Sequence, residues 1–304
     1  DHGERTRAGA AKLPYQGKAS SLTAVGTNAI AWLQDDYIGR LAWDVDAAGR
    51  SRSRCQLDHE AITAPCTNDL ALWLDASTLQ QSNQSAVTSL ADLSGKHNAA
   101  EVNGNAPSFN APDSANALNG KGTVHFTASS NLADATGLKT WSPLGIAGKQ
   151  PRSIFVVMRR SPGRSRMLIN LGNVAAQGEY FGLCDMYDKL FLPSGAFRRS
   201  DHDGSLPRLQ PAWRILEVIY DGKSSQSYVN GSYQGTVTQP FNTANQAVEI
   251  GLRTAGDLAS RNAAGAQGDF AELLIYGRAL NLSEQRQVED YLREKWFATE
   301  AAQH

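Results

Sequence analysis

The sequence has little cysteine, no excess of charge of one sign and no long apolar run. Three cysteines in 304 residues are too few for a disulfide scaffold, and none forms a C-x-x-C pair, so sulfur-bound zinc and thiol exchange are not indicated. The 29 basic residues balance 30 acidic ones, for a net charge of -1, and nucleic-acid binding is not expected without a basic excess. No run of about 18 apolar residues occurs, so no membrane span is expected within the chain.

What remains is an ordinary globular composition, with 41% hydrophobic residues. A chain of this length can bury roughly 75% of the surface that its unfolded form exposes, in one large domain or two smaller ones. Asp1 to Arg5 lack the apolar core of a signal peptide. We therefore expect a processed mature chain or one from which an anchor was removed.

The first 68 residues differ in composition from the rest and are expected to form an arm. Residues 1–27 have no steady periodicity and suggest a tail or irregular segment. From Asn28, apolar residues recur at spacings of three and four, which predicts one amphipathic helix ending by Gly49. Gly39 and the aromatic content leave a hairpin open as the alternative. Residues 50–68 have loop chemistry, and we place the domain boundary there.

Cys55 and Cys66 lie eleven positions apart across a polar stretch of this arm. Closing a loop of roughly 15 residues is worth about 3 kcal/mol in the chain-entropy estimate. We expect a Cys55–Cys66 disulfide and hence an oxidising compartment. Two free thiols are the alternative.

Beyond residue 68, short apolar runs alternate with clusters of Gly, Asn, Asp and Ser. Many short strands separated by turns predict a mainly β fold, a two-sheet antiparallel sandwich or jelly roll. Asn230-Gly231 suits a type I′ turn and predicts a hairpin that joins residues 226–229 to 233–237. The predicted strands are 70–74, 123–126, 153–158, 167–171, 180–183, 214–220, 226–229, 247–252 and 270–276.

One helix is expected after the last strand. Asn281 can cap its first turn, and Glu284 can return a hydrogen bond to the backbone of the cap, as in a capping box. The domain is expected to close near Phe297, with a frayed tail at 298–304. The apolar face of this helix contains Val288, Tyr291, Leu292 and Trp296.

The order of several segments points to a known family. The segments are LALWLD at 70–75, LADLSGKHNA at 90–99, LNGK at 118–121, SIFVVM at 153–158, YVNG at 228–231 and GDFAELLIYGRAL at 268–280. Together they resemble bacterial laminin G-like domains of the concanavalin A-like lectin/glucanase superfamily, over residues 69–297. The resemblance implies a jelly roll whose first and last strands lie side by side. It also implies a choice among glycan-binding modules, adhesion domains, hydrolases and lyases.

The residues argue against an enzyme. Retaining glucanases of this superfamily have a Glu-x-Asp-x-x-Glu strand that aims two carboxyls at one groove. The nearest acidic strand here offers Asp269 and Glu272, three positions apart and so expected on opposite faces. His125, alone on its strand, is expected to be structural. A polysaccharide hydrolase or lyase is the lower-ranked alternative.

Calcium is the one cofactor that the sequence suggests. Many laminin G-like relatives hold an ion at the rim of the sandwich, and loops rich in Asp provide its oxygen ligands. Asp201 and Asp203 share one short loop, and Asp185 and Asp188 form a second candidate. Acidic solvated loops are the alternative. Asp92, before Ser94, is expected to form an Asx turn rather than a metal bond.

Glycan binding needs exposed aromatic faces and short polar groups. Packing in the core or rim is the alternative for each aromatic residue, and a solvated surface is the alternative for the arginines, which could meet an anionic polysaccharide. The candidate ligand-binding residues are Trp141, Tyr180, Tyr187, Trp213, Arg198 and Arg199.

A second resemblance concerns the arm. Residues 41–49 followed by Cys55 resemble the end of the long first helix, and the loop after it, in minor pilins of type IV pili. The chain departs from that pattern because it lacks the apolar first half of the helix. This resemblance implies a structural or tip subunit of a pilus-like assembly.

The sequence thus predicts a non-enzymatic binding or adhesion module, extracellular or displayed on a cell surface. Its expected partner is a glycan or another surface molecule, recognised through loops at the rim of the sandwich. The filament subunit is the alternative, with other subunits as partners.

Overall fold

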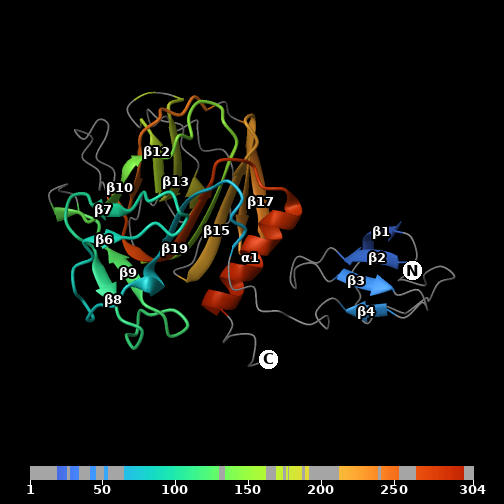
Figure 1. Ribbon diagram of the computed structural model, residues 1–304, viewed down its shortest axis with the longest axis horizontal. Coiled ribbons are helices and arrows are strands. Elements are labelled where there is room, and N and C mark those ends of the chain that lie inside the picture. Colours follow the sequence, from blue (N-terminus) through green and yellow to red (C-terminus); the bar gives the residue numbers. More distant parts are fainter. Residues whose placement is uncertain are drawn as a thin grey trace. The chain divides into compact units, whose positions relative to one another are not determined.

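A computed structural model provides the structure of the chain (Figure 1). It describes residues 65–129, 134–161, 169–173, 176, 178–186, 189–191, 212–238, 241–252 and 265–297, although only the backbone is described at 184–186 and 189–191. It also describes the backbone of strands at 19–25, 28–33, 42–45 and 51–53. The chain divides into two compact units, Asp1–Ile62 and Thr63–His304. The predicted tail at 298–304 lies outside the described residues.

The first unit contains a four-stranded antiparallel sheet. Its strands follow each other in chain order, as β1 (Ala19–Val25), β2 (Asn28–Leu33), β3 (Ala42–Val45) and β4 (Ser51–Ser53).

This sheet corrects two predictions for the arm. The amphipathic helix predicted from Asn28 to Gly49 is wrong, because β2 and β3 pair antiparallel there, and the segment expected to be irregular contains β1. Ile30 and Trp32 also fit a period of two, and β-branched and aromatic residues favour extended backbone. Gly39 further disfavours a helix. The resemblance to minor pilins loses its basis, since it rested on that helix.

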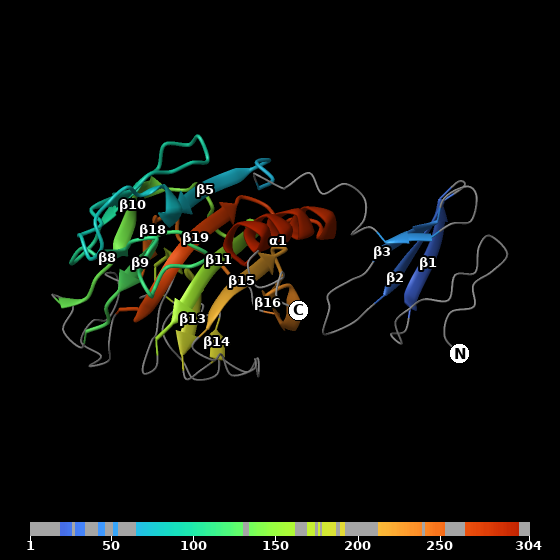
Figure 2. The same cartoon turned by 90° about the horizontal axis from the view of Figure 1, so that it is seen from below.

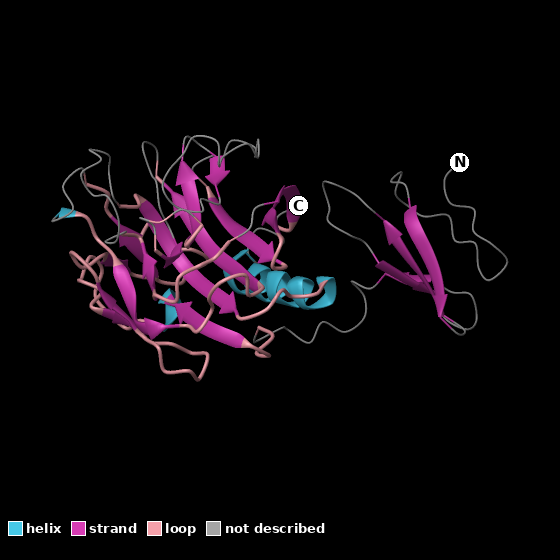
Figure 3. Ribbon diagram, turned by 90° about the horizontal axis from the view of Figure 1, so that it is seen from above, coloured by secondary structure: helices cyan, strands magenta, loops and turns pink. Residues whose placement is uncertain are grey.

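The second unit is a sandwich of two antiparallel sheets (Figure 3). The seven-stranded sheet contains, in spatial order, β14 (Lys189–Phe191), β13 (Tyr180–Met186), β12 (Ile169–Gly172), β18 (Ala247–Ile250), β10 (Leu138–Pro143), β7 (Ala100–Val102) and β6 (Ser89–Leu90). The eight-stranded sheet contains β17 (Ser232–Thr238), β16 (Ser224–Val229), β15 (Trp213–Tyr220), β11 (Arg152–Arg160), β19 (Gly268–Tyr276), β9 (Thr123–Phe126), β8 (Ser108–Asn110) and, paired to β19, β5 (Leu70–Asp75). A short 3-10 helix, η2 (Ala76–Thr78), follows β5.

The predicted jelly-roll sandwich is confirmed in its main features. Each predicted strand coincides with an observed one, and β5 pairs antiparallel with β19, so the first and last strands of the sandwich lie side by side. Asn230 and Gly231 both have positive φ, 51° and 77°, and join β16 to β17. These are the backbone angles that a type I′ hairpin requires.

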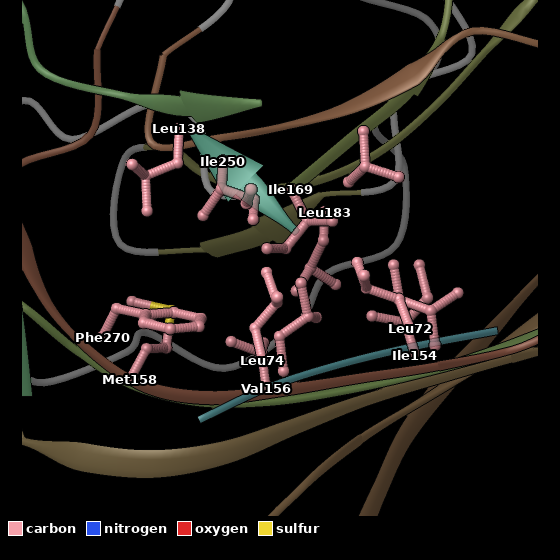
Figure 4. Close-up of a cluster of buried hydrophobic side chains, with 14 of the residues drawn as sticks. Leu72, Leu74, Leu138, Ile154, Val156, Met158, Ile169, Leu183, Ile250 and Phe270 are labelled. Atoms are coloured by element: carbon pink, nitrogen blue, oxygen red, sulfur yellow. The ribbon is translucent and has the colours of Figure 1, made fainter. Parts of the chain in front are cut away.

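The core lies between the two sheets. Strands alternate, so every second residue of each sheet points inward. Figure 4 shows Leu72, Ile154 and Val156 of the eight-stranded sheet facing Ile169 and Ile250 of the seven-stranded sheet. All five are at most 1% exposed. This alternation leaves the other face of each sheet for function.

One helix, α1 (Leu282–Phe297), lies along the outer face of the eight-stranded sheet (Figure 2). The predicted capping box is confirmed: Asn281 Oδ1 accepts hydrogen bonds from the backbone of Ser283 and Glu284, and Glu284 Oε2 accepts one from Asn281 N at 3.0 Å. The predicted apolar face is also confirmed, because Val288, Tyr291, Leu292 and Trp296 are buried.

Cys66 is half-buried and carries a free thiol among the described residues, and the predicted disulfide with Cys55 stays a prediction. Cys55 itself lies outside the described residues and belongs to the other unit. Cys66 is instead a neighbour of Arg278, whose Nη2 lies 3.9 Å from Cys66 Sγ, and its carbonyl accepts a hydrogen bond from the Tyr276 hydroxyl. No helix among the described residues is long and apolar enough to cross a membrane.

Candidate functional site

One cavity between the two sheets is too small to hold a ligand. That cavity lies between the sheets, lined by Phe126, Met158, Ile169, Ile250 and Phe270, and has a volume of about 10 Å³. This is roughly the space of one water molecule. This cavity is therefore too small for a saccharide, and the outer faces formed by the described strands are the candidate binding surfaces.

Polar residues cross the outer face of the seven-stranded sheet in a single row. Their positions are paired from strand to strand, and each lies between neighbours that point into the core or pack at the edge. We call this set the lysine row; it contains Asn170, Glu249, Lys139, Glu101 and Ser89, and Gly182 is opposite Asn170 at its buried end.

The lysine row changes from buried to exposed along its length. Asn170 and Glu249 are 2% and 6% exposed, whereas the Lys139 side chain is 43% exposed and Glu101 is exposed. Lys139 Nζ lies 3.6 Å from Glu249 Oε1, a loose ion pair. Asn170 Oδ1 accepts a hydrogen bond from the Tyr180 hydroxyl, while its Nδ2 has no partner among the described residues.

Trp141 stands beside the lysine row. It follows Lys139 by two positions on β10, so both side chains leave the same face of the sheet. Leu138 and Thr140 are buried, and the pairing of β10 with β7 is regular through Thr140, although the register against β18 shifts between Lys139 and Pro143. Trp141 is 62% exposed, the largest exposed fraction of any large apolar side chain in the described part of the chain.

A second row crosses the outer face of the eight-stranded sheet. Its positions are again paired from strand to strand. We call it the arginine row; it contains Trp213, Arg159, Asp269, His125 and Ser108.

Asp269 is the centre of the arginine row and is 4% exposed. Its Oδ1 accepts hydrogen bonds from His125 Nδ1 at 2.8 Å and Asn110 Nδ2 at 3.0 Å. Its Oδ2 accepts from Arg159 Nε at 2.9 Å and Arg159 Nη2 at 2.7 Å. Burial alone would raise the pKa of Asp269, but the bonds from His125 and Arg159 outweigh it and hold that pKa below its usual value. Asp269 is therefore ionised, and it orients the His125 imidazole and the Arg159 guanidinium, which are both partly exposed.

A bulge in β19 brings Asp269 and Glu272 to the same face of the sheet. The register against β11 shifts between Val157 and Met158, so that Val157 is opposite Glu272 and Arg159 is opposite Asp269. The prediction that Asp269 and Glu272 lie on opposite faces is therefore wrong, because a bulge adds one residue to the alternation.

Glu272 lies under α1 and is closed off by it. Its two oxygens accept hydrogen bonds from Trp73 Nε1, the Tyr291 hydroxyl, Lys295 Nζ and Trp296 Nε1, at 2.6 to 2.8 Å. Burial raises the pKa of Glu272 above its usual value, although Lys295 acts against this. With no exposed surface and four donors, Glu272 fastens the helix to the sheet and cannot meet a substrate.

One pair of carboxyls does meet under α1. Glu217 on β15 and Glu289 on α1 share a hydrogen bond, and the Gln285 amide donates to both at 3.1 Å. Burial raises the pKa of Glu217 well above its usual value, and the neighbouring Glu289 raises it further. Both residues are buried, at 0% and 5% exposed, so this pair is not an accessible acid and base.

The predicted ligand-binding residues are dispersed. Trp141 is exposed on β10, Tyr180 is fully buried, and Trp213 is half-buried, with the Arg159 guanidinium 5.3 Å from its ring centre. Tyr180 is therefore a covered residue rather than an exposed platform, because its ring lies over Gly182, where a Cβ would collide with it. The candidates outside the described residues are Tyr187, Arg198 and Arg199.

The calcium candidates cannot be brought together from the described residues. Asp185 is described only as backbone in β13, and Asp188, Asp201 and Asp203 lie outside the described part. Where side chains are described, no group of three His, Cys, Asp or Glu could hold a metal ion. Asp92 forms the predicted Asx turn, with Ser94 N donating to Asp92 Oδ1 at 2.9 Å.

Sequence reasoning missed both rows. It considered His125 and Asp269 separately, and did not single out Arg159, Lys139 or Asn170. Single polar residues between apolar neighbours in a strand were the available signal, since that pattern marks an outer face.

No family model matches the sequence, and no curated protein matches it. Solved structures do match. Domain 4 of AbnA, a GH43 extracellular arabinanase from Geobacillus stearothermophilus, in complex with arabinotriose, has a TM-score of 0.50 at 15% identity; the match covers 73% of this chain and 98% of that domain. A botulinum neurotoxin type C structure has a TM-score of 0.50 at 12% identity, over 74% of this chain and 52% of the other. The chain thus spans about half the length of the neurotoxin structure.

These likenesses define the fold as a two-sheet β-sandwich shared with binding domains. At such low identity they are likenesses of fold. The closer resemblance to laminin G-like domains stays a prediction.

Proposed function

We propose that this protein is a non-enzymatic glycan-binding module, secreted or displayed on a cell surface, and that it binds saccharide on the outer face of the seven-stranded sheet. The observation that carries the proposal is Trp141, 62% exposed beside the polar lysine row. An exposed indole leaves apolar surface in contact with water, and a ligand that covers this surface gains binding free energy.

The combination suits the chemistry of a sugar ring. One face of a pyranose or furanose ring carries C–H groups, which pack on an indole face, while its edge carries hydroxyls that need donors and acceptors. Lys139 supplies a donor, and Glu101 and Ser89 supply exposed acceptors on the same face. A ligand lying across β10, β7 and β6 would meet both kinds of group.

The structural neighbours support the choice of ligand. The arabinanase domain is described in complex with arabinotriose, and cell entry of the type C neurotoxin is described as dependent upon interaction with two ganglioside molecules. Arabinotriose is an oligosaccharide and a ganglioside carries an oligosaccharide head group, although this chain matches only 52% of the neurotoxin structure.

The carboxyl groups favour binding over catalysis. Glycoside hydrolysis needs two accessible carboxyls that flank the scissile bond. Asp269 is saturated by four hydrogen bonds, Glu272 is closed off under α1, and the Glu217–Glu289 pair is buried. None of these groups is free to protonate or attack a substrate.

The test is binding to a panel of neutral oligosaccharides that includes arabinotriose, with calcium and with a chelator. Trp141→Ala should weaken binding about 30-fold, since truncating an anchoring aromatic residue costs about 2 kcal/mol or more. Tyr233→Ala is the matched control: Tyr233 is also exposed, at 57%, but lies on β17 of the other sheet.

Equal losses in the two variants would contradict the proposed face, and absence of binding to the whole panel would contradict the proposed ligand class. Release of reducing ends or unsaturated products from any member would show an enzyme instead. Dependence of binding on calcium would place the ion in the ligand site.

A further inference from the structure

The arginine row carries an inference that goes beyond this function. We propose that it is a second site, which binds the carboxylate group of an acidic saccharide. The choice of a saccharide rests on the proposed function; the choice of a carboxylate rests on the row itself.

Arg159 is held in one orientation before any ligand arrives. Nε and Nη2 donate to Asp269 Oδ2, Nη2 also donates to Asn116 Oδ1 at 2.8 Å, and the guanidinium lies over the Trp213 ring. Its side chain is nevertheless 26% exposed. A fixed guanidinium gives up little conformational entropy on binding, which favours affinity.

The polar atoms around Arg159 that have no described partner are hydrogen-bond donors. All the described hydrogen bonds to Asp269 use its oxygens as acceptors, and Asn116 uses its Oδ1. Within the described part of the chain, no partner is found for Arg159 Nη1, Asn116 Nδ2 or Trp213 Nε1. A surplus of donors around a guanidinium matches a group that only accepts, and a carboxylate is such a group.

Arg278 shows what a purely structural arginine looks like in this protein. It is 23% exposed, close to the value for Arg159, but both of its terminal nitrogens donate to one carboxylate. Nε lies 3.3 Å from Asp69 Oδ2, Nη1 donates to Glu284 at 2.6 Å, and Nη2 donates to Glu284 at 2.9 Å. Arg159 differs because only one of its two terminal nitrogens, Nη2, donates to a described partner.

The site lies where α1 no longer covers the sheet. The last turn of α1 places Lys295 and Trp296 on Glu272, which is opposite Val157 on β11. Arg159 is two residues further along β11, about 7 Å beyond. His125, on the far side of Asp269, is 27% exposed, so a ligand can reach the row from solvent.

The experiment compares the trisaccharide of galacturonic acid with its methyl ester, by calorimetry and by the indole N–H signals of the full chain in NMR spectra. The two ligands share rings and hydroxyls, and the ester lacks the carboxylate charge. We expect the acid to bind at least tenfold more tightly than the ester and to shift the indole signal that Trp213→Phe removes. Acetate is the third probe and should bind far more weakly than the trisaccharide.

Arg159→Gln should remove the preference for the acid, and Arg278→Gln should leave it unchanged. If Arg159→Gln does not fold, Asn116→Asp replaces it: this change puts a carboxylate on Arg159 from an exposed position, and should weaken binding of the acid tenfold or more without loss of stability.

Equal affinity for acid and ester, or no binding of the acid, would overturn the proposal. So would wild-type affinity in Arg159→Gln or Asn116→Asp. Acetate binding as tightly as the trisaccharide would overturn the choice of a saccharide. Trp141→Ala should retain the preference for the acid, so that failure here and failure of the neutral glycan site are distinguishable.

Discussion

The two outer faces of the sandwich carry the same device, a row of paired polar residues, and use it in opposite ways. In the arginine row, the buried carboxylate accepts four hydrogen bonds and both of its strand neighbours are fixed. In the lysine row, Lys139 Nζ lies 3.6 Å from Glu249 Oε1 and the Lys139 side chain is 43% exposed. The difference follows from burial, because a buried charge must be compensated while an exposed one is already solvated. The arginine row specifies structure and leaves Arg159 partly exposed. The lysine row is buried at Asn170 and Glu249, and only its exposed end is left to a ligand.

The largest expected effect comes from removing the centre of the arginine row. Asp269→Ala would leave His125, Asn110 and Arg159 without their acceptor at a position that is 4% exposed. Breaking a buried network in this way costs about 3 kcal/mol. Denaturant unfolding should show that loss as a lower midpoint with an unchanged slope. A loss under about 1 kcal/mol would mean that the row is not a closed network.

The second prediction compares how stability depends on pH through Glu217, which α1 covers, and through Asp269, which α1 leaves uncovered. Glu217, under α1, has a pKa raised above its ordinary value of 4.5 by burial. Its folded form therefore keeps a proton that the unfolded chain has lost, so stability is full below about pH 4.5 and falls as pH rises through the folded pKa. Asp269 has a pKa below its ordinary value of 3.8, so its contribution is lost as pH falls through the folded pKa.

Glu217→Gln should remove the loss of stability on the alkaline side, a difference on the order of 1 kcal/mol or more between about pH 5 and pH 8. Asp269→Asn should flatten the acid side instead. Free energies of unfolding measured from about pH 2 to about pH 8 for the three proteins check both. If Glu217→Gln changed the acid side only, the assignment of the raised pKa to Glu217 would be wrong.

Features that depend on adjacent residues could be predicted from the sequence. The Asn230-Gly231 turn, the Asn281 and Glu284 capping box and the Asx turn at Asp92 all follow from side chains within a few positions of the backbone that they bond. Strand-length apolar runs were sufficient for the sandwich, since each run needs a second layer to cover it.

The rows could not be predicted, because they depend on register between distant strands. His125 and Asp269 are 144 positions apart and meet only once β9 pairs with β19. The bulge in β19 changes which face Glu272 occupies, and nothing in the adjacent residues announces it. In the arm, short apolar runs fit both periods, and pairing between β2 and β3 decided for strand.

The smallest expected effect belongs to the lysine row and tests the comparison from its other side. Lys139→Gln removes the partner of Glu249 but keeps a polar side chain at an exposed position, and loose exposed pairs contribute little to stability. We expect the free energy of unfolding to change by less than about 0.5 kcal/mol, with the midpoint of denaturant unfolding as the measurement. Binding of neutral saccharide by the same variant should weaken, since Lys139 is beside Trp141 on the proposed face. A stability loss near that of Asp269→Ala would make both rows structural and would remove the distinction on which the glycan site depends.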